Sequence, residues 1–195
     1  TILATALGTV AALGLSRPHM PFKAVLMAIL ISPMIVPLII TAAGMFFFYS
    51  KIGLTHTYLG LILAHTALGT PFVVITVTAT LTGFDTNLIR ASQSLGADTM
   101  RTFFKVIMPL ILPGVISGAL FAFITSFDEV VVVMFVGSVE QITIPKQMWA
   151  GLRQETSPVI LCMATCLVFL SIALLTTVEL LRRRSERLRG IKLQN

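Results

Sequence analysis

Two adjacent carboxylates, Asp128 and Glu129, interrupt an otherwise apolar stretch of the sequence. They follow a long uncharged run, so a helix built from this run would end in two negative charges. Carboxylates at a helix C-terminus oppose the helix dipole, at a cost of about 0.3 to 1 kcal/mol each. A cationic substrate would offset this cost, and so would solvent, a basic residue on the same side of a membrane, or a capping role for Asp128 in the next segment.

A candidate substrate pathway surrounds these carboxylates. The apolar run 130–139 is too short to cross a membrane as a helix, so we expect a partly buried or re-entrant segment there. Trp149 lies in a segment, 145–153, whose apolar residues recur at helical spacing, and it could either anchor at a membrane interface or stack on a substrate. The pathway candidates are Phe127, Asp128, Glu129, Phe135 and Trp149.

The remaining reactive side chains do not suggest a catalytic or metal site. His65 lies in a long apolar run, where it could respond to protons, contact a substrate or bond to a neighbouring helix. Cys162 and Cys166 lie one helical turn apart with no histidine or carboxylate at ligand spacing, which favours packing over a metal site or a disulfide. The sequence contains no P-loop, zinc-protease or nucleophile-elbow motif. We therefore expect no catalytic residue, no metal and no cofactor bound by this chain.

The composition is that of an integral membrane protein. Of the 195 residues, 56% are hydrophobic and 11% charged, with a mean hydropathy of +0.95, whereas about a quarter of the residues in soluble domains are charged. Four uncharged runs reach the length of about 20 residues that crosses a bilayer as a helix, and a fifth, 1–16, is slightly short. The four runs are 24–50, 52–84, 106–127 and 156–178. We expect the sequence to begin inside a helix, with upstream sequence missing.

Prolines and glycines modify two of these runs. Pro33 and Pro37 should kink the helix formed by 24–50, because each removes a backbone hydrogen bond. Gly114 and Gly118 lie four residues apart in the run 106–127, and small residues at this spacing let helices approach closely. This run should therefore pack tightly against a neighbouring helix or a partner subunit.

A polar segment, residues 84–105, separates two of the runs. Asp85 can cap a short helix, Gly96 can supply the left-handed residue that ends it, and Asp98 can cap a second helix. The first helix would carry Leu88, Ser92 and Leu95 on one face. The sequence thus predicts a helical corner with a partly apolar surface, suited to docking another protein.

The spacing within this segment resembles the EAA loop of binding-protein-dependent ABC importer permeases. In that family, Glu-Ala-Ala, three residues, Gly and nine residues precede Ile-x-Leu-Pro. Here Ala91, Gly96 and Pro109 match, Ser92, Val106 and Met108 are mild replacements, and Arg90 reverses the charge of the usual Glu. The resemblance assigns coupling to an ATPase to Arg90, Ala91, Ser92, Leu95, Gly96, Ala97, Val106 and Pro109.

The distribution of basic residues predicts how the chain is oriented in the membrane. If the segment 84–105 is cytoplasmic and every run crosses once, 11 of the 14 basic residues lie in the cytoplasm and only Lys51, Lys146 and Arg153 lie outside. This asymmetry follows the positive-inside rule. The basic tail 182–195 would then be cytoplasmic and contact lipid headgroups. The net charge of +6 has this explanation and does not indicate a nucleic acid partner.

A second resemblance, carried by residues 126–132, 144–145 and 156–158, extends over most of residues 22–182. It is to the spermidine/putrescine-type branch of these permeases. It implies an all-α transmembrane fold of the type I ABC importer kind, with five visible spans and one more upstream. Residues 1–195 would form a single transmembrane domain, within which 84–105 is the cytoplasmic coupling loop.

The function implied is that of a non-catalytic subunit of an ATP-driven importer. It would move a small solute, such as a polyamine, across the bacterial inner membrane, with its C-terminus in the cytoplasm. The implied partners are a second permease subunit, two ATP-binding subunits that hold ATP and Mg²⁺, a periplasmic solute-binding protein and membrane lipid. Closure of the ATPase dimer would push the coupling loop and tilt the helix 106–127.

The alternative is an ATP-independent secondary transporter or channel. In this interpretation Asp128, Glu129 and His65 form an ion relay. It predicts ionisable groups near the middle of the membrane and needs no docking loop. In the sequence, the acids lie at a membrane boundary and the loop is present.

Overall fold

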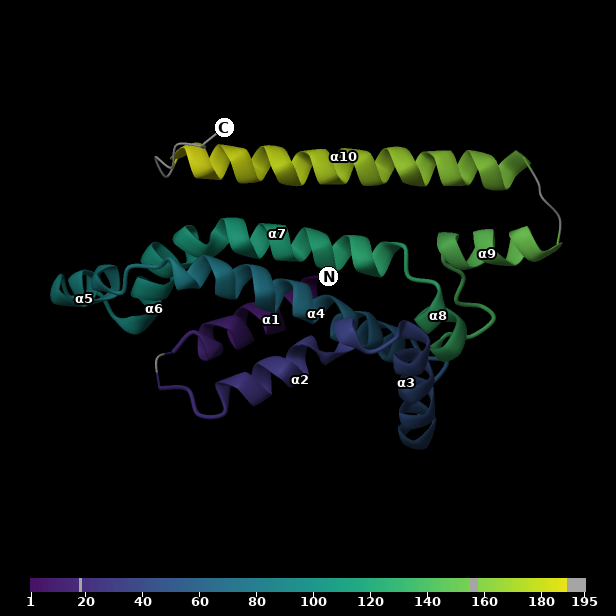
Figure 1. The fold of residues 1–195 in the computed structure, drawn as a ribbon, viewed down its shortest axis with the longest axis horizontal. Coiled ribbons are helices and arrows are strands. Elements are labelled where there is room, and N and C mark those ends of the chain that lie inside the picture. Colours follow the sequence, from purple (N-terminus) through teal and green to yellow (C-terminus); the bar gives the residue numbers. More distant parts are fainter. Residues whose placement is uncertain (18, 155–157, 189–195) are drawn as a thin grey trace.

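The computed structural model describes residues 1–17, 19–154 and 158–188, and within these ranges it contains helices and no strand (Figure 1). The expected all-α fold is thus confirmed. The helices are α1 (Ile2–Leu15), α2 (Lys23–Ile35), α3 (Leu38–Ile52), α4 (Tyr58–Thr82), α5 (Asn87–Ser94), α6 (Thr99–Thr102), α7 (Met108–Phe127), α8 (Val131–Val136), α9 (Ile144–Gln154) and α10 (Pro158–Leu188), with a π-helical turn, Phe103–Ile107, before α7.

Three helical stretches are long and apolar enough to cross a membrane. They are Tyr58–Thr82, Thr99–Phe127 and Pro158–Thr177, and α2 with α3 would make a fourth if the bent pair counts as one span. α1 has 14 residues, fewer than the about 20 that a crossing requires. By length and composition, the described residues therefore supply three or four of the five expected crossings.

The run 24–50 is broken rather than gently kinked. The axes of α2 and α3 differ by 106°. Pro37 lies at the break, and Val36 before it is extended, with ψ of 135°, because a proline disfavours the helical conformation of the preceding residue. Pro33 lies inside α2. The expected change of direction is confirmed at Pro37, while Pro33 lies within a continuous α2.

Tight packing of α4 against α1 and α7 forms the centre of the bundle. Val73 of α4 is fully buried between Gly8 of α1 and Gly118 of α7. A Cβ atom at Gly118 would lie 2.8 Å from the Val73 Cα atom, and one at Gly114 would collide with the Thr80 side chain. Only glycine permits this approach, so the expected close contact is confirmed and α4 is the neighbour.

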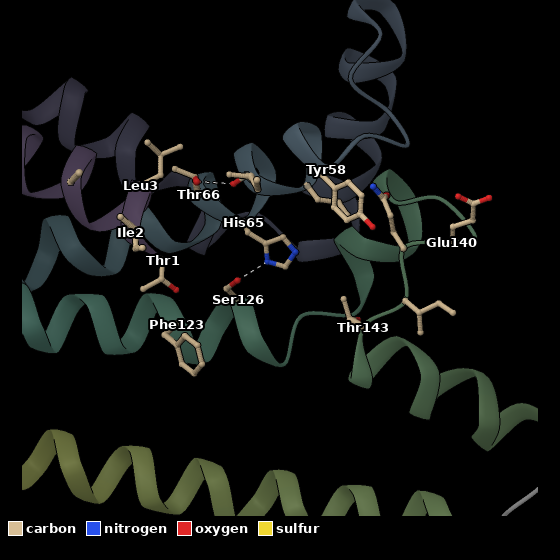
Figure 2. A pocket seen from close by; sticks show the side chains of 15 residues that line it. Thr1, Ile2, Leu3, Tyr58, His65, Thr66, Phe123, Ser126, Glu140 and Thr143 are labelled. Carbon is tan, nitrogen blue, oxygen red and sulfur yellow. Dashed lines mark hydrogen bonds between the residues drawn. The ribbon is translucent and has the colours of Figure 1, made fainter.

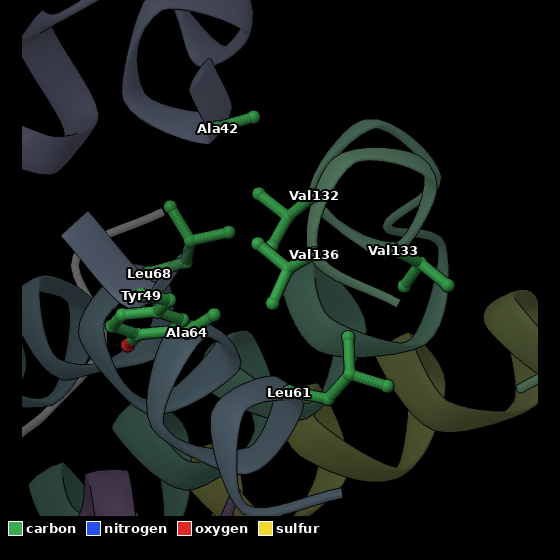
Figure 3. Packing of buried hydrophobic residues seen from close by; sticks show 8 residues of the cluster. All are labelled: Ala42, Tyr49, Leu61, Ala64, Leu68, Val132, Val133 and Val136. Atoms are coloured by element: carbon green, nitrogen blue, oxygen red, sulfur yellow. The ribbon is translucent and has the colours of Figure 1, made fainter. Parts of the chain in front are cut away.

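A second apolar cluster lies where α3, α4 and α8 meet (Figure 3). Three valines of α8 are fully buried in it, so the short run 130–139 is a partly buried segment, as expected. His56, in the α3–α4 loop, holds this segment: its backbone N–H donates to Val136 O at 2.8 Å, and its Nδ1 lies 3.1 Å from Gly137 O. The cluster consists of Ala42, Tyr49, Leu61, Ala64, Leu68, Val132, Val133 and Val136.

The bundle is elongated, and its two ends carry different features (Figure 1). α5, α6 and the last turns of α10 lie at one end, which we call the loop end. α8 and α9 lie at the other, which we call the cavity end. The start of the basic tail therefore lies at the same end of the bundle as the segment 84–105 (Figure 1). Residues 189–195 of that tail lie outside the described residues.

Candidate functional site

The segment between α4 and α7 forms a capped helical corner at the loop end. Asp85 Oδ1 accepts a hydrogen bond from the backbone N–H of Asn87 at 2.9 Å, and Asp98 Oδ1 accepts one from the backbone N–H of Arg101 at 2.7 Å. Gly96, between α5 and α6, has φ of +81°, a conformation that L side chains rarely adopt. The Asp98 cap and the left-handed glycine are confirmed, whereas Thr86 is the N-cap of α5 and Asp85 precedes it.

One side-chain hydrogen bond fixes the angle between α5 and α6. Ser92 Oγ lies 2.9 Å from Thr102 Oγ1, and Thr102 is buried. The backbone N–H of Ala97 also donates to Ser92 O at 3.1 Å. Ser92, a predicted coupling residue, thus holds the corner from inside. Thr102 was not among the predicted residues, because its partner lies on another helix.

The exposed surface of this corner combines apolar and basic side chains. Leu95 is 88% exposed and lies next to Gly96 at the tip. The exposed carboxylates of Asp85 and Asp98 accept backbone hydrogen bonds, and the basic side chains exceed them by one charge. The exposed apolar side chains are Leu88, Leu95, Met100 and Phe104, and the exposed basic ones are Arg90, Arg101 and Lys105. Such a patch is typical of a protein interaction surface.

The corner continues directly into a spanning helix. α6, the π-helical turn and α7 form one helical stretch, Thr99–Phe127. Val106, half-buried, lies in the π-helical turn, and Pro109, which has no backbone N–H to donate, follows this turn at the start of α7. A displacement of α6 would therefore be transmitted to α7. The predicted coupling residues fall in two groups, 90–97 on the corner and 106–109 at the base of α7.

The two carboxylates at the cavity end have different environments. Glu129 is only 6% exposed, and its Oε1 accepts a hydrogen bond from the backbone N–H of Val132 at 2.7 Å. Burial raises the pKa of Glu129, and the charge of Asp128 adds to this effect, while hydrogen bonds from the α8 backbone oppose it. Asp128 is exposed. Glu129, rather than Asp128, therefore caps the segment that follows.

The other predicted pathway residues are dispersed over the cavity end. Phe127 stacks on Phe123, with ring centroids 5.4 Å apart. Phe135 packs against the apolar cluster of α3, α4 and α8. Trp149 is half-exposed on α9. The structure thus does not gather the five predicted pathway residues around one point.

A cavity of about 1020 Å³ opens at this end between α1, α4, α7 and the segment 140–143 (Figure 2). His65 of α4 and Ser126 of α7 meet at its wall, with His65 Nδ1 and Ser126 Oγ 3.0 Å apart. The interpretation of His65 as bonded to a neighbouring helix is confirmed, and the residue also lines the cavity. The polar lining residues are Thr1, Tyr58, His65, Thr66, Ser126, Glu140, Gln141 and Thr143.

The loop at the rim of the cavity is held by its own polar groups. Gln141 is buried, and its Oε1 accepts a hydrogen bond from the backbone N–H of Ser138 at 2.8 Å. Lys146 Nζ donates to Ser138 O at 2.7 Å and to Gln141 O at 3.1 Å. The Lys146 ammonium group is thus directed to the backbone of the loop. The lining includes one carboxylate, Glu140, and no lysine or arginine.

Comparison with known sequences identifies the family. The profile described as binding-protein-dependent transport system inner membrane component matches residues 4–188. The chain belongs to this family. This permease is similar to the spermidine/putrescine transport system permease protein PotC of Haemophilus influenzae, with 32% identity over 94% of this chain and 71% of that protein. PotC of Escherichia coli K12 is 30% identical over 92% of this chain and 68% of that protein.

The fold of the permease has a counterpart among solved structures. A chain of the MetNI methionine ABC transporter, in inward-facing crystals, superimposes with a TM-score of 0.66 at 23% identity, covering 98% of this chain and 88% of that chain. The fold is therefore that of a type I ABC importer permease. The chain is a multi-pass membrane protein that works in a complex with other transport subunits, and nothing in these comparisons favours the secondary-transporter alternative.

Sequence reasoning missed most of the cavity. His65 was singled out because it is ionisable within an apolar run. Ser126 and Tyr58 gave no such signal, since serine and tyrosine are common in membrane proteins and their convergence depends on how α4 packs against α7. Glu140 and Thr143 reach the cavity only because the loop folds back. A polar residue at matching depth in each of two packed helices is the one signal that could have indicated the His65–Ser126 pair.

Proposed function

We propose that this permease is the transmembrane subunit of an ATP-driven importer for a polyamine or a similar small cation. The observation that carries this proposal is the 32% identity with a spermidine/putrescine permease over 94% of the chain. The charge of the cavity supports it, because a lining with one carboxylate and no basic side chain favours cations. Asp128, at the cavity end of α7, adds an exposed carboxylate, so it also carries the negative charge that would attract a cation.

The proposed assembly contains a second permease, two ATP-binding subunits and a solute-binding protein delivering the solute from the periplasm. The chain itself lacks a P-loop, so ATP and Mg²⁺ would be held by the ATP-binding subunits and this chain would bind no cofactor. The apolar and basic corner of α5 and α6 is the surface we assign to an ATP-binding subunit. Exposed apolar faces of α2 and α10 would contact the second permease and lipid.

In the proposed mechanism, the ATP-binding subunits act on the corner and the bundle responds. Their closure displaces α6, and the continuous helix from Thr99 to Phe127 carries the displacement towards the cavity end. Because Gly114 and Gly118 place α7 directly on α4, the two helices move together rather than α7 tilting alone. ATP then shifts the population between two packed arrangements of the bundle.

The proposed orientation places the loop end in the cytoplasm of a bacterial inner membrane. We expect a cysteine at Thr55, in the α3–α4 loop of the cavity end, to react with a membrane-impermeant maleimide added to intact cells. A cysteine at Ser185, in the last turns of α10, should react only after the cells are opened. Cys162 and Cys166 are replaced by alanine in both variants. Labelling of Ser185→Cys but not Thr55→Cys in intact cells would reverse the orientation.

The substrate class is tested by uptake into proteoliposomes that contain the whole complex. Labelled putrescine, delivered by the solute-binding protein, should accumulate when ATP is inside, and unlabelled spermidine should compete. Unlabelled 1,4-butanediol, which has the same chain length without the charges, should not compete. Equal competition by the diol would refute a cationic substrate.

A further inference from the structure

We propose that the cavity between α1, α4 and α7 is a binding site for a primary alkylammonium group, with neutral His65 as its hydrogen-bond acceptor. The inference rests on the proposed function, since it assigns part of the path of a cationic solute to named residues. It goes further in locating a contact inside the permease, apart from the five residues predicted from the sequence.

The one charged side chain in the cavity lining is a carboxylate, which favours a cation. Glu140 is the one carboxylate among the lining side chains, and it is exposed at the rim. Lys146, the basic residue of the same loop, is not among the lining residues, and its Nζ donates to Ser138 O at 2.7 Å and to Gln141 O at 3.1 Å, so its charge is directed at backbone carbonyls of the loop. A cation entering past Glu140 therefore meets attraction at the rim and no basic side chain in the lining. An anion would meet a carboxylate.

The lining also contains aromatic side chains that can attract an ammonium group and aliphatic side chains that can contact the methylene groups of an alkylammonium ion. Tyr58 and Phe123 contribute aromatic rings from α4 and α7, on the same cavity as the imidazole of His65 (Figure 2). Aromatic faces attract ammonium groups, by about 0.5 to 2 kcal/mol according to exposure. Ile2, Leu61 and Ile62 provide apolar surface for methylene groups. The cavity thus combines an apolar wall with a few polar groups, as small-molecule sites do.

The geometry of His65 determines which atom could receive the ammonium group. His65 Nδ1 lies 3.0 Å from Ser126 Oγ, and no hydrogen bond from a described residue engages the other ring nitrogen, Nε2. An ammonium group only donates hydrogen bonds. Nε2 must therefore accept, which requires the proton of the neutral imidazole to lie on Nδ1 and to be donated to Ser126 Oγ. Ser126 is thus a positioning residue that fixes the ring and its tautomer.

A photoreactive ligand tests the site directly. A putrescine derivative that carries a diazirine on its carbon chain is irradiated with the reconstituted complex, and the labelled peptides are identified. We expect labelling of peptides that contain residues 58–66 and 123–126. Unlabelled putrescine should suppress it, and 1,4-butanediol should not. Labelling confined to other helices, or suppressed equally by the diol, would overturn the proposal.

Variants distinguish the loss of the hydrogen-bond acceptor at His65 from a change in the shape of the cavity. His65→Leu should lower specific labelling about tenfold, since a hydrogen bond to a charged group is lost, whereas His65→Gln retains a neutral acceptor and should keep most of it. Ser126→Ala should give an intermediate loss. Ile75→Val, on α4 but away from the cavity, is the matched control for packing. Assembly with the ATP-binding subunits is measured for each variant, and the intermediate loss expected of Ser126→Ala carries the test should His65→Leu fail to assemble.

The outcomes distinguish this inference from the proposed function. If the wild-type complex accumulates putrescine but the His65→Leu complex is labelled and transports as well as the wild type, the proposed cavity site is refuted. The proposed function as an importer is then unaffected. If the wild-type complex does not accumulate putrescine under any condition, the substrate class is wrong. In that second case, labelling of residues 58–66 that unlabelled putrescine suppresses and the diol does not would still establish an ammonium site.

Discussion

Gly96→Val is expected to leave the permease in the membrane but uncouple it from its ATP-binding subunits. Gly96 has φ of +81°, and no atom lies within 4 Å of the position that a Cβ atom would take, so the added side chain meets no steric obstacle. Its cost arises from the backbone, since the left-handed region costs an L residue about 1 to 2 kcal/mol and β-branching adds to this. That cost changes the population of the native corner about fivefold to thirtyfold.

The measurement is solute-stimulated ATP hydrolysis by the reconstituted complex. We expect stimulation to fall about tenfold in Gly96→Val. Gly83→Val is the matched control, because Gly83 lies in the same segment with φ of −91° and equally open space around its Cβ position. It should retain stimulation close to the wild type. If both variants behave alike while assembling normally, the conformation of the corner does not govern coupling.

Gly118→Val is expected to destabilise the bundle strongly. A Cβ atom at this position would lie 2.8 Å from the Val73 Cα atom and would also collide with the Thr76 side chain. Because one of the obstructing atoms belongs to the backbone of α4, the two helices would have to separate. Overpacking of this kind costs about 1 to 3 kcal/mol or more. The same change should also loosen the α4–α7 pair that we propose moves as a unit.

Thermal unfolding of the detergent-solubilised chain provides the readout. Gly118→Val should lower the unfolding temperature by several degrees, as about 1 to 3 kcal/mol does in a protein of this size. Gly44→Val is the control, since Gly44 lies within α3 with nothing near its Cβ position. It places the same β-branched residue in a helix without the collision. Equal loss of stability in the two variants would mean that helix propensity, and not contact with α4, is responsible.

The corner at the loop end was predictable because its determinants are local. Asp85 and Asp98 lie within three residues of the backbone N–H groups that donate to them, and Gly96 is the residue for which positive φ is least costly. None of these features depends on a distant part of the chain. The hydrogen bond between Ser92 and Thr102, which joins two helices, was correspondingly missed.

The spanning helices were predictable in type but less so in arrangement. Hydropathy and length placed the runs, and the Gly114–Gly118 spacing indicated a close contact, yet the sequence did not say that α4 would be the partner. Proline in the run 24–50 predicted a kink, while the observed change of direction at Pro37 is 106°. After the break α3 packs against α8, and this contact between residues far apart in the chain could not be predicted from local sequence.

The cavity end was the least predictable region for the same reason. Adjacent carboxylates drew attention to Asp128 and Glu129, but Glu129 is buried as a cap. Asp128 was the residue considered as a possible cap, but Glu129 has this role, because the sequence does not show at which residue the next helix begins. His65, Ser126 and Glu140 come from three separate segments and meet only in the folded bundle.

The central claim is that this permease couples solute import to ATP hydrolysis on a partner subunit. The most direct measurement is uptake of labelled putrescine by proteoliposomes that contain the complete complex, with ATP inside and the solute-binding protein outside. Uptake should require ATP, and it should stop when the P-loop lysine of the ATP-binding subunit is replaced by alanine. It should be unaffected when the proton and sodium gradients are collapsed. Uptake that persists with the inactive ATP-binding subunit and follows an ion gradient would contradict the account and favour a secondary transporter.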